Sequence, residues 1–178
     1  RAFPHARMDG GLRGAGTQVR LDERDDLGRN AAPAGGVASS ANDLAAWLHT
    51  QLAGGVAPDG KRVFSKATHA QMWAPSMTVP LDEMPPELKL IESTFANYGL
   101  GWDLVDYRGA RMVWHGGAVL GFGTAVVMLP EQKVGFAIAI NSEDGELVRG
   151  LMYELADHYL AKPKADWPAT FENYKANK

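Results

Sequence analysis

Residues 98–141 decide the fold of this chain, and they run YGLGWDLVDYRGARMVWHGGAVLGFGTAVVMLPEQKVGFAIAIN. Strand-forming runs alternate with turn residues throughout this stretch, which predicts four strands, at 98–107, 110–114, 124–129 and 133–140. Only Arg108-Gly109 joins the first pair, and only residues 130–132 join the second. Because links this short connect antiparallel neighbours, the sequence predicts an antiparallel sheet.

Both faces of the predicted sheet require a cover. Residues 124–129 and 133–140 are apolar almost throughout, whereas a strand with one wet face alternates apolar and polar residues. Strands of this kind are buried on both sides, so helices are expected on both faces. The fold class that follows is α+β, an antiparallel β-sheet flanked by helices.

Two longer helices are predicted to supply most of that cover. The first follows Ser40, which can cap it, carries Asp43 in its first turn and stops at the Gly-Gly pair at 54–55. The second spans 146–160. Its apolar side chains recur every four residues and are expected to face the sheet: Leu147, Leu151, Leu155 and Tyr159.

Three stretches lack the periodicity of helices or strands. Residues 1–36 are rich in glycine, proline and charge, and we expect irregular surface structure there. A short helix is predicted at 66–73, after which the prolines in 76–92 predict a long loop of the kind that often forms a lid or site wall. The chain turns polar after Pro163, where we expect a linker or tail.

Composition narrows the function classes. With 178 residues, 46% of them apolar, the chain can bury the core of one domain. Its net charge of −3 and the lack of a Lys/Arg cluster give no reason to expect a nucleic-acid partner. It has no cysteine, hence no disulfide or thiolate chemistry, and no apolar run approaches the ~18 residues of a membrane span. No apolar stretch follows Arg1, so we expect no signal peptide in these residues.

A short motif after the second predicted strand has the composition of a substrate-binding edge. When a serine attacks a carbonyl, the developing oxyanion needs fixed amide donors, and a sheet edge can supply one of them. His115-Gly116-Gly117-Ala118 offers small residues at such an edge, because glycine lets another backbone approach closely. The imidazole can hydrogen-bond or titrate near neutral pH.

In its context this motif resembles the serine β-lactamases and penicillin-binding-type hydrolases. These carry Lys-Thr-Gly on the corresponding strand, and related esterases and D-aminopeptidases often replace it with His-x-Gly, as at residues 115–117 here. The resemblance covers most of residues 30–162. Further matching segments lie on both sides of the motif: Gly35-Gly36 with Ser39 to Leu44, Tyr98-Gly-Leu-Gly-Trp102, Gly121-Phe122-Gly123, Leu129-Pro130-Glu131 and Ile140-Asn141.

The resemblance implies a role for each site residue. Ala118 corresponds to the residue whose backbone amide completes the oxyanion hole, and His115 to a polar group that faces the substrate. Gly116 and Gly117 form the edge along which substrate lies, and Asn141 is a further candidate for substrate contact. A small-molecule or peptide-like substrate is implied, with no metal and no organic cofactor.

The catalytic serine of that family is not encoded in these residues. No serine is followed by lysine three places on, and no tyrosine stands in a Tyr-x-Asn motif. We therefore expect residues 1–162 to be the C-terminal portion of a catalytic domain, inactive alone, and 163–178 to lead towards a further domain. Because His115 replaces a lysine, ester or amide hydrolysis ranks above β-lactam hydrolysis. The resemblance is in keeping with a bacterial protein that is periplasmic or secreted.

Other interpretations remain open on the sequence. A non-catalytic module could bind a ligand or partner through the same groove, and a purely structural domain would also account for the apolar stripes. His115 itself could be a buried histidine satisfied by a backbone carbonyl. Because the family's sheet includes strands from upstream, we also expect an open sheet edge, to be covered by a second copy or by a complementary N-terminal segment.

Overall fold

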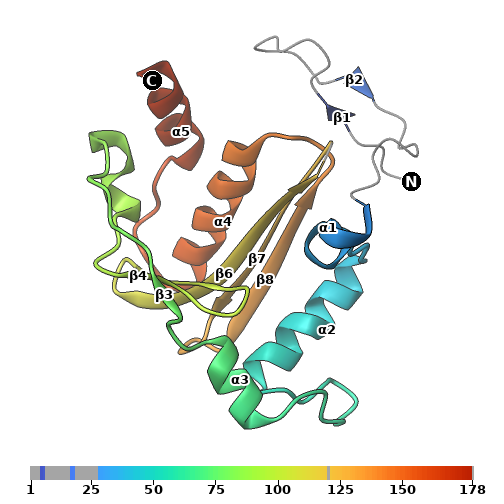
Figure 1. The fold of residues 1–178 in the computed structure, drawn as a ribbon. Coiled ribbons are helices and arrows are strands. Elements are labelled where there is room, and N and C mark those ends of the chain that lie inside the picture. The colour runs from blue at the N-terminus through green and yellow to red at the C-terminus, as the bar shows by residue number, and fades with distance from the viewer. Residues whose placement is uncertain (1–4, 7–16, 19–27, 120, 178) are drawn as a thin grey trace.

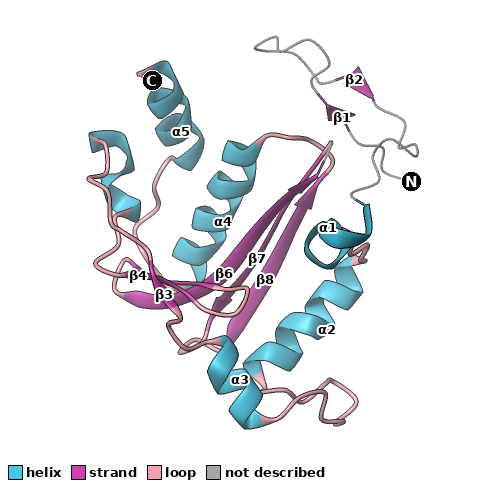
Figure 2. Ribbon diagram, in the orientation of Figure 1, coloured by secondary structure: helices cyan, strands magenta, loops and turns pink. Residues whose placement is uncertain are grey.

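A six-stranded antiparallel sheet in the order β3-β4-β5-β6-β7-β8 forms the centre of the molecule (Figures 1 and 2). The structure is a computed structural model that describes residues 5–6, 17–18, 28–119 and 121–177. The strands of this sheet are Met77–Thr78 (β3), Ala96–Tyr98 (β4), Asp103–Tyr107 (β5), Ala110–Val119 (β6), Phe122–Leu129 (β7) and Val134–Ile140 (β8). A separate antiparallel pair joins β1 (His5–Ala6) to β2 (Thr17–Gln18).

Helices lie on both faces of the sheet, with α4 on one side and α2 on the other (Figure 2). The helices are Gly28–Gly35 (α1), Ala41–Leu52 (α2), Lys66–Met72 (α3), Gly145–Tyr159 (α4) and Trp167–Ala176 (α5), with a 3-10 helix at Pro86–Ile91 (η2). The predicted fold class, an antiparallel sheet flanked by helices, is confirmed.

Two apolar clusters, one on each face, hold these layers together. The α4 face is formed by buried side chains of the sheet, α4, α5 and η2, among them Tyr107, Met112, Val127, Leu129, Met152 and Trp167. The opposite face is formed by Leu48, Trp73, Trp102, Leu104, Val113 and Met128. Val127 and Met128 are adjacent in β7 and wholly buried, yet they belong to different clusters. The prediction that the apolar strands are covered on both faces is therefore confirmed.

The start of α2 is formed as its sequence predicts. Ser40 is the N-cap: its side chain accepts a hydrogen bond from the backbone N–H of Asp43 at 3.2 Å. The Asp43 carboxylate accepts in return from the backbone N–H of Ser40 at 3.3 Å. This reciprocal capping box satisfies amides that the first helical turn would otherwise leave unpaired.

Several boundaries differ from the prediction. The strand predicted at 98–107 is interrupted, because residues 99–102 form a loop between β4 and β5. The region 76–92 contains β3 and η2 instead of being irregular throughout, and α1 forms within the segment 1–36. The rest of that segment, apart from β1 and β2, lies outside the described residues.

The face that helix α4 presents to the sheet only partly matches the predicted one. Leu147 and Leu151 are 47% and 40% exposed, whereas Val148 and Met152 are 7% and 1% exposed and pack in the core. The two apolar rows run side by side along the helix, each at four-residue spacing. Of the predicted row, Leu155 does pack against this core and Tyr159 stacks on Phe136 of β8. The prediction is therefore wrong for Leu147 and Leu151 and right for Leu155 and Tyr159.

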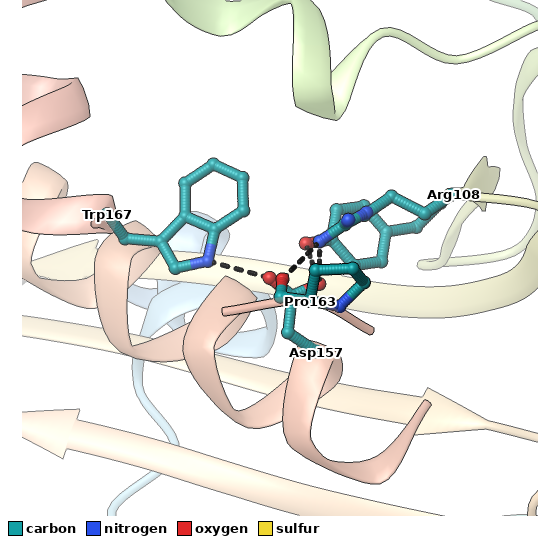
Figure 3. A network of polar contacts seen from close by, with 5 residues as sticks. Arg108, Asp157, Pro163 and Trp167 are labelled. Atoms are coloured by element: carbon teal, nitrogen blue, oxygen red, sulfur yellow. Dashed lines mark hydrogen bonds and ion pairs between the residues drawn. The ribbon is translucent and has the colours of Figure 1, made fainter. Parts of the chain in front are cut away.

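The residues after Pro163, expected as a linker or tail, include a helix that packs in the core. Trp167 of α5 is wholly buried, and its indole N–H donates to Asp157 of α4 at 3.0 Å. The same carboxylate accepts from the hydroxyl of Tyr107 and from Arg108, each at 2.7 Å (Figure 3). This polar node ties α5 and α4 to the hairpin between β5 and β6.

Strand β8 ends the sheet, and no described strand pairs with its outer side. The open edge that the sequence predicts is thus present among the described residues. None of the helices in the described part of the chain combines the length and apolar composition that crossing a bilayer requires.

Candidate functional site

Strand β6 continues well past the end of its neighbour β5. Residues 110–114 of β6 pair with β5, and the register ends at Asp103 opposite Trp114. Residues 113–119 pair with β7 on the other side. The segment 115–119 therefore has β7 on one side and no described strand on the other, and it contains the whole predicted motif.

The hydrogen-bonding groups of β6 alternate between its two sides. Tyr107 and Ala110 face each other across a two-residue turn in which both residues have positive φ, 49° and 85°. Residues that flank such a turn exchange both N–H···O bonds, so the N–H of Ala110 points towards β5. Every second residue repeats this direction, and the pairing with both neighbours has no bulge. The N–H groups of Gly116 and Ala118 therefore face the open side.

The two glycines of the motif lie where there is little room for a side chain. A Cβ at Gly117 would lie 2.8 Å from the side-chain oxygen of Thr124, closer than real Cβ contacts come. That hydroxyl donates to the carbonyl of Gly117 at 3.2 Å, which fixes it in place. A Cβ at Gly116 would lie 3.3 Å from the ring of Trp114. Small residues at 116–118 thus leave the open edge accessible to another backbone.

His115 stands where the open edge begins and contacts a residue from two strands away. Its Nε2 lies 3.0 Å from the hydroxyl of Tyr98, at the end of β4, with the two ring centroids 6.1 Å apart. Burial raises the pKa of the nearby Asp103 carboxyl, while the positive charge that His115 carries when protonated lowers it. His115 is predicted as a site residue from the sequence, whereas Tyr98 is not.

Four of the five predicted site residues lie together, and the fifth lies apart. His115, Gly116, Gly117 and Ala118 follow one another along the open side of β6. Asn141 comes directly after β8, which is separated from β6 by β7. It is at the same end of the sheet as Ala118 but two strand spacings away, roughly 10 Å.

The hollows at the surface of the described structure lie elsewhere than this edge in the two best-formed cases. Two hollows in the described structure are bounded by residues of α4 and α5, including Leu151 and Phe171, and neither is lined by a residue of β6. Within the described residues, no three His, Asp or Glu side chains gather as metal ligands would. The candidate site is an exposed strand edge with a polar pair, His115 and Tyr98, at its start.

Comparison with known proteins gives the context of this edge. A family model described as Beta-lactamase matches residues 4–160. The unguisins hydrolase ungD' of Aspergillus campestris is 29% identical over 147 residues, and penicillin-binding protein 4 of Amycolatopsis lactamdurans is 32% identical over 137 residues. The alignments cover 79% and 74% of this chain but 25% and 34% of those proteins. The chain thus spans about a quarter to a third of their length.

A solved structure has a similar fold over part of its length. The octameric penicillin-binding protein homologue from Pyrococcus abyssi matches with a TM-score of 0.53 and 24% identity. The match covers 70% of this chain and 25% of that chain. At this level of identity the likeness concerns the fold alone.

Proposed function

Because this chain belongs to the beta-lactamase family, we propose that it forms one wall of the acyl-transfer site of a serine hydrolase that cleaves ester or amide, peptide-like bonds. The observation that carries the proposal is the open side of β6 at residues 115–119, where the N–H of Ala118 is directed away from the sheet ladder. An amide that is held on a rigid strand and that no described strand pairs with suits the stabilisation of an oxyanion.

The proposed reaction proceeds in two steps. A serine oxygen attacks the substrate carbonyl, and the tetrahedral oxyanion collapses to an acyl-enzyme as the alcohol or amine leaves with a proton. Water then attacks the acyl-enzyme, which releases the acid and restores the serine. No serine of this chain has lysine three places on, so we propose that the nucleophile and its base lie elsewhere in the polypeptide and that residues 1–178 alone are inactive.

The roles within this chain follow the geometry of the edge. The Ala118 N–H donates to the oxyanion, and Gly116 and Gly117 let an extended substrate lie beside β6 in the manner of an added strand. His115 offers a polar contact at the start of the edge. Asn141 follows β8, on the other side of β7 from the edge. It would therefore contact only a substrate that extends across β7.

The expected substrates follow from the residue at position 115. Lysine at that place would offer a permanent positive charge to a substrate carboxylate, whereas an imidazole carries no permanent charge. We therefore propose that neutral esters and amides are hydrolysed in preference to penicillin-like acids.

The test compares two polypeptides: residues 1–178 alone and the product that the whole gene encodes. Nitrocefin and p-nitrophenyl esters are offered to both. We expect ester turnover by the complete product, sensitive to serine-directed acylating reagents, and none above buffer by residues 1–178. Complete product without Ser-x-x-Lys and without turnover would favour a non-catalytic binding module instead.

A single substitution tests the oxyanion role. Proline is tolerated in a strand where its nitrogen faces an open edge, so Ala118→Pro removes the proposed donor without removing a ladder hydrogen bond. We expect kcat of the complete product to fall about 10²- to 10³-fold. Unchanged kcat in a folded variant would show that this amide does not contact the oxyanion.

The outer edge of β8, with which no described strand pairs, is a second surface where we expect a partner strand. An unpaired apolar strand edge favours pairing with another strand, and we propose that a second copy or a complementary N-terminal segment covers it. Analytical ultracentrifugation of residues 1–178, with and without the upstream polypeptide, tests this. A stable monomer of residues 1–178 in which β8 exchanges its amide hydrogens slowly would contradict it.

A further inference from the structure

We infer that Tyr98 is a positioning residue of the proposed hydrolase, whose hydroxyl holds the imidazole of His115 in one orientation and one tautomer beside the open edge of β6. This inference rests on the proposed function. It assigns a role to the Tyr-Gly-Leu-Gly-Trp stretch at 98–102, which the proposed chemistry has not otherwise used.

The loop after Tyr98 is built to keep that tyrosine in place. Trp102 is 4% exposed and packs in the core cluster on the α2 face, and its carbonyl accepts from the backbone N–H of Gly99 at 2.8 Å. A Cβ at Gly99 would lie only 2.4 Å from the carbonyl oxygen of Met72, so the loop fits closely against the end of α3. The N–H of Leu100 donates to that same oxygen at 3.0 Å.

The tyrosine backbone is also fixed on both sides. Tyr98 pairs with Met77 of β3 and with Asp103 of β5, and its carbonyl accepts from Ser76 at 2.9 Å. The hydroxyl of Tyr98 is thus carried by a strand and a loop that are both anchored. It lies 3.0 Å from Nε2 of His115, a residue 17 positions later in the chain.

This contact selects the form of the imidazole. A phenol is the better donor of the two groups and a neutral imidazole nitrogen the better acceptor, so the Tyr98 hydroxyl donates to Nε2. The ring proton of neutral His115 then lies on Nδ1, the less populated form of a free histidine side chain. Among the described residues Nδ1 has no hydrogen-bond partner, which leaves its N–H to donate to a substrate oxygen at the edge.

The first experiment reads the tautomer directly. In the complete gene product labelled with ¹⁵N-histidine, two-bond ¹H–¹⁵N correlation spectra at a pH where the ring is neutral should show His115 with its proton on Nδ1. In Tyr98→Phe the ring should shift towards the Nε2–H form. Tyr159→Phe is the matched control, because Tyr159 is an exposed α4 residue that stacks on Phe136 and does not contact His115.

The second experiment measures how the substitutions change kcat/KM. We expect Tyr98→Phe to lower kcat/KM for a p-nitrophenyl ester roughly 3- to 10-fold, the effect of losing one positioning hydrogen bond, and Tyr159→Phe to leave it unchanged. Combining Tyr98→Phe with His115→Gln should add no further loss beyond His115→Gln alone, because both act through one imidazole. Thermal unfolding of each variant shows whether the fold is kept.

The possible outcomes separate this inference from the proposed function. A His115 ring with its proton on Nε2, a ring that does not respond to Tyr98→Phe, or additive losses in the double variant would overturn the positioning role while hydrolysis stands. A complete product that hydrolyses no ester or amide would instead refute the proposed function, and with it the reaction in which Tyr98 acts, whatever the tautomer.

Discussion

Replacing Asp157 by alanine should destabilise the chain by about 3–5 kcal/mol, because this carboxylate is a buried acceptor for three donors. Its side chain is 6% exposed and that of its ion-pair partner Arg108 is 16% exposed. Figure 3 shows the carboxylate between the indole of Trp167 and the guanidinium. It therefore joins α4, α5 and the β5–β6 hairpin at one point.

The magnitude follows from what each donor loses. The hydroxyl of Tyr107 and the indole N–H of Trp167 are 2% and 0% exposed as residues, so neither regains water when the acceptor is removed. Each buried donor that is left without an acceptor costs about 1–3 kcal/mol of stability. Arg108 adds less, since it keeps a contact with the carbonyl of Pro163 at 3.3 Å and is partly solvated. Burial, reinforced by the hydrogen bond to Asp157, raises the pKa of Tyr107, so its hydroxyl remains a donor at neutral pH.

Urea unfolding followed by tryptophan fluorescence measures the effect. A loss of this size should lower the urea midpoint by roughly 2 M if the transition stays two-state. Glu154→Ala is the matched control on the same helix: it removes a 3.7 Å contact to the exposed Lys164 and should change stability by less than about 0.5 kcal/mol. An Asp157→Ala variant that lost no more than this control would refute the account of the node.

Three further predictions concern Gly99 in the loop after β4, His69 in α3 and the N-cap of α2. Gly99→Ala should lower stability by about 1–3 kcal/mol, since the added Cβ would meet a main-chain carbonyl of α3 at 2.4 Å, whereas Gly145→Ala, with open space around it, should be nearly neutral in thermal unfolding. Burial lowers the pKa of His69, so the unfolded chain binds the proton more readily than the folded chain does. The contribution of His69 to stability should therefore be complete above pH about 6.5 and fall as the pH drops below that value. The urea midpoint should decrease between pH 7.5 and about 5, and His69→Phe should remove the part of this decrease that His69 causes. Ser40→Ala should cost about 1 kcal/mol through loss of the α2 cap, and Ser39→Ala, one residue outside it, much less by the same assay.

The sequence predicts best those features that depend on residues close together in the chain. Ser40 and Asp43 are three residues apart, and their capping box marks the start of α2 correctly. Arg108-Gly109 likewise marks the turn between β5 and β6, because both positions adopt positive φ. Such local signals need no knowledge of the tertiary neighbours.

The sequence predicts less well which side of an element faces the core. In α4 the row with Leu147 and the row with Val148 are both apolar, and only the position of the sheet decides between them. In α5 the polar composition conceals two buried aromatic anchors, Trp167 and Phe171. A signal was present there: Asp166 caps the helix and Pro168 lies in its first turn, a usual pattern for a helix start.

The candidate site, too, is predicted from the sequence only in part. The small residues after His115 predict an accessible edge, and the register places them on one. That β5 ends opposite Trp114 could not be predicted, because the interruption at 99–102 is set by the packing of Trp102 and Gly99 against α3 and the core. The contact from Tyr98 to His115 depends on that interruption, and no pattern within the chain indicates it.

Amide hydrogen exchange at Ala118 tests the central claim most directly. In the complete gene product the N–H of Ala118 should exchange fast, while that of its neighbour Gly117, which faces β7, should be protected. Acylation by a serine-directed phosphonate, whose oxygen mimics the oxyanion, should then slow exchange at Ala118 selectively. An Ala118 amide already protected before the reaction, or one that the reaction leaves unchanged, would contradict the account.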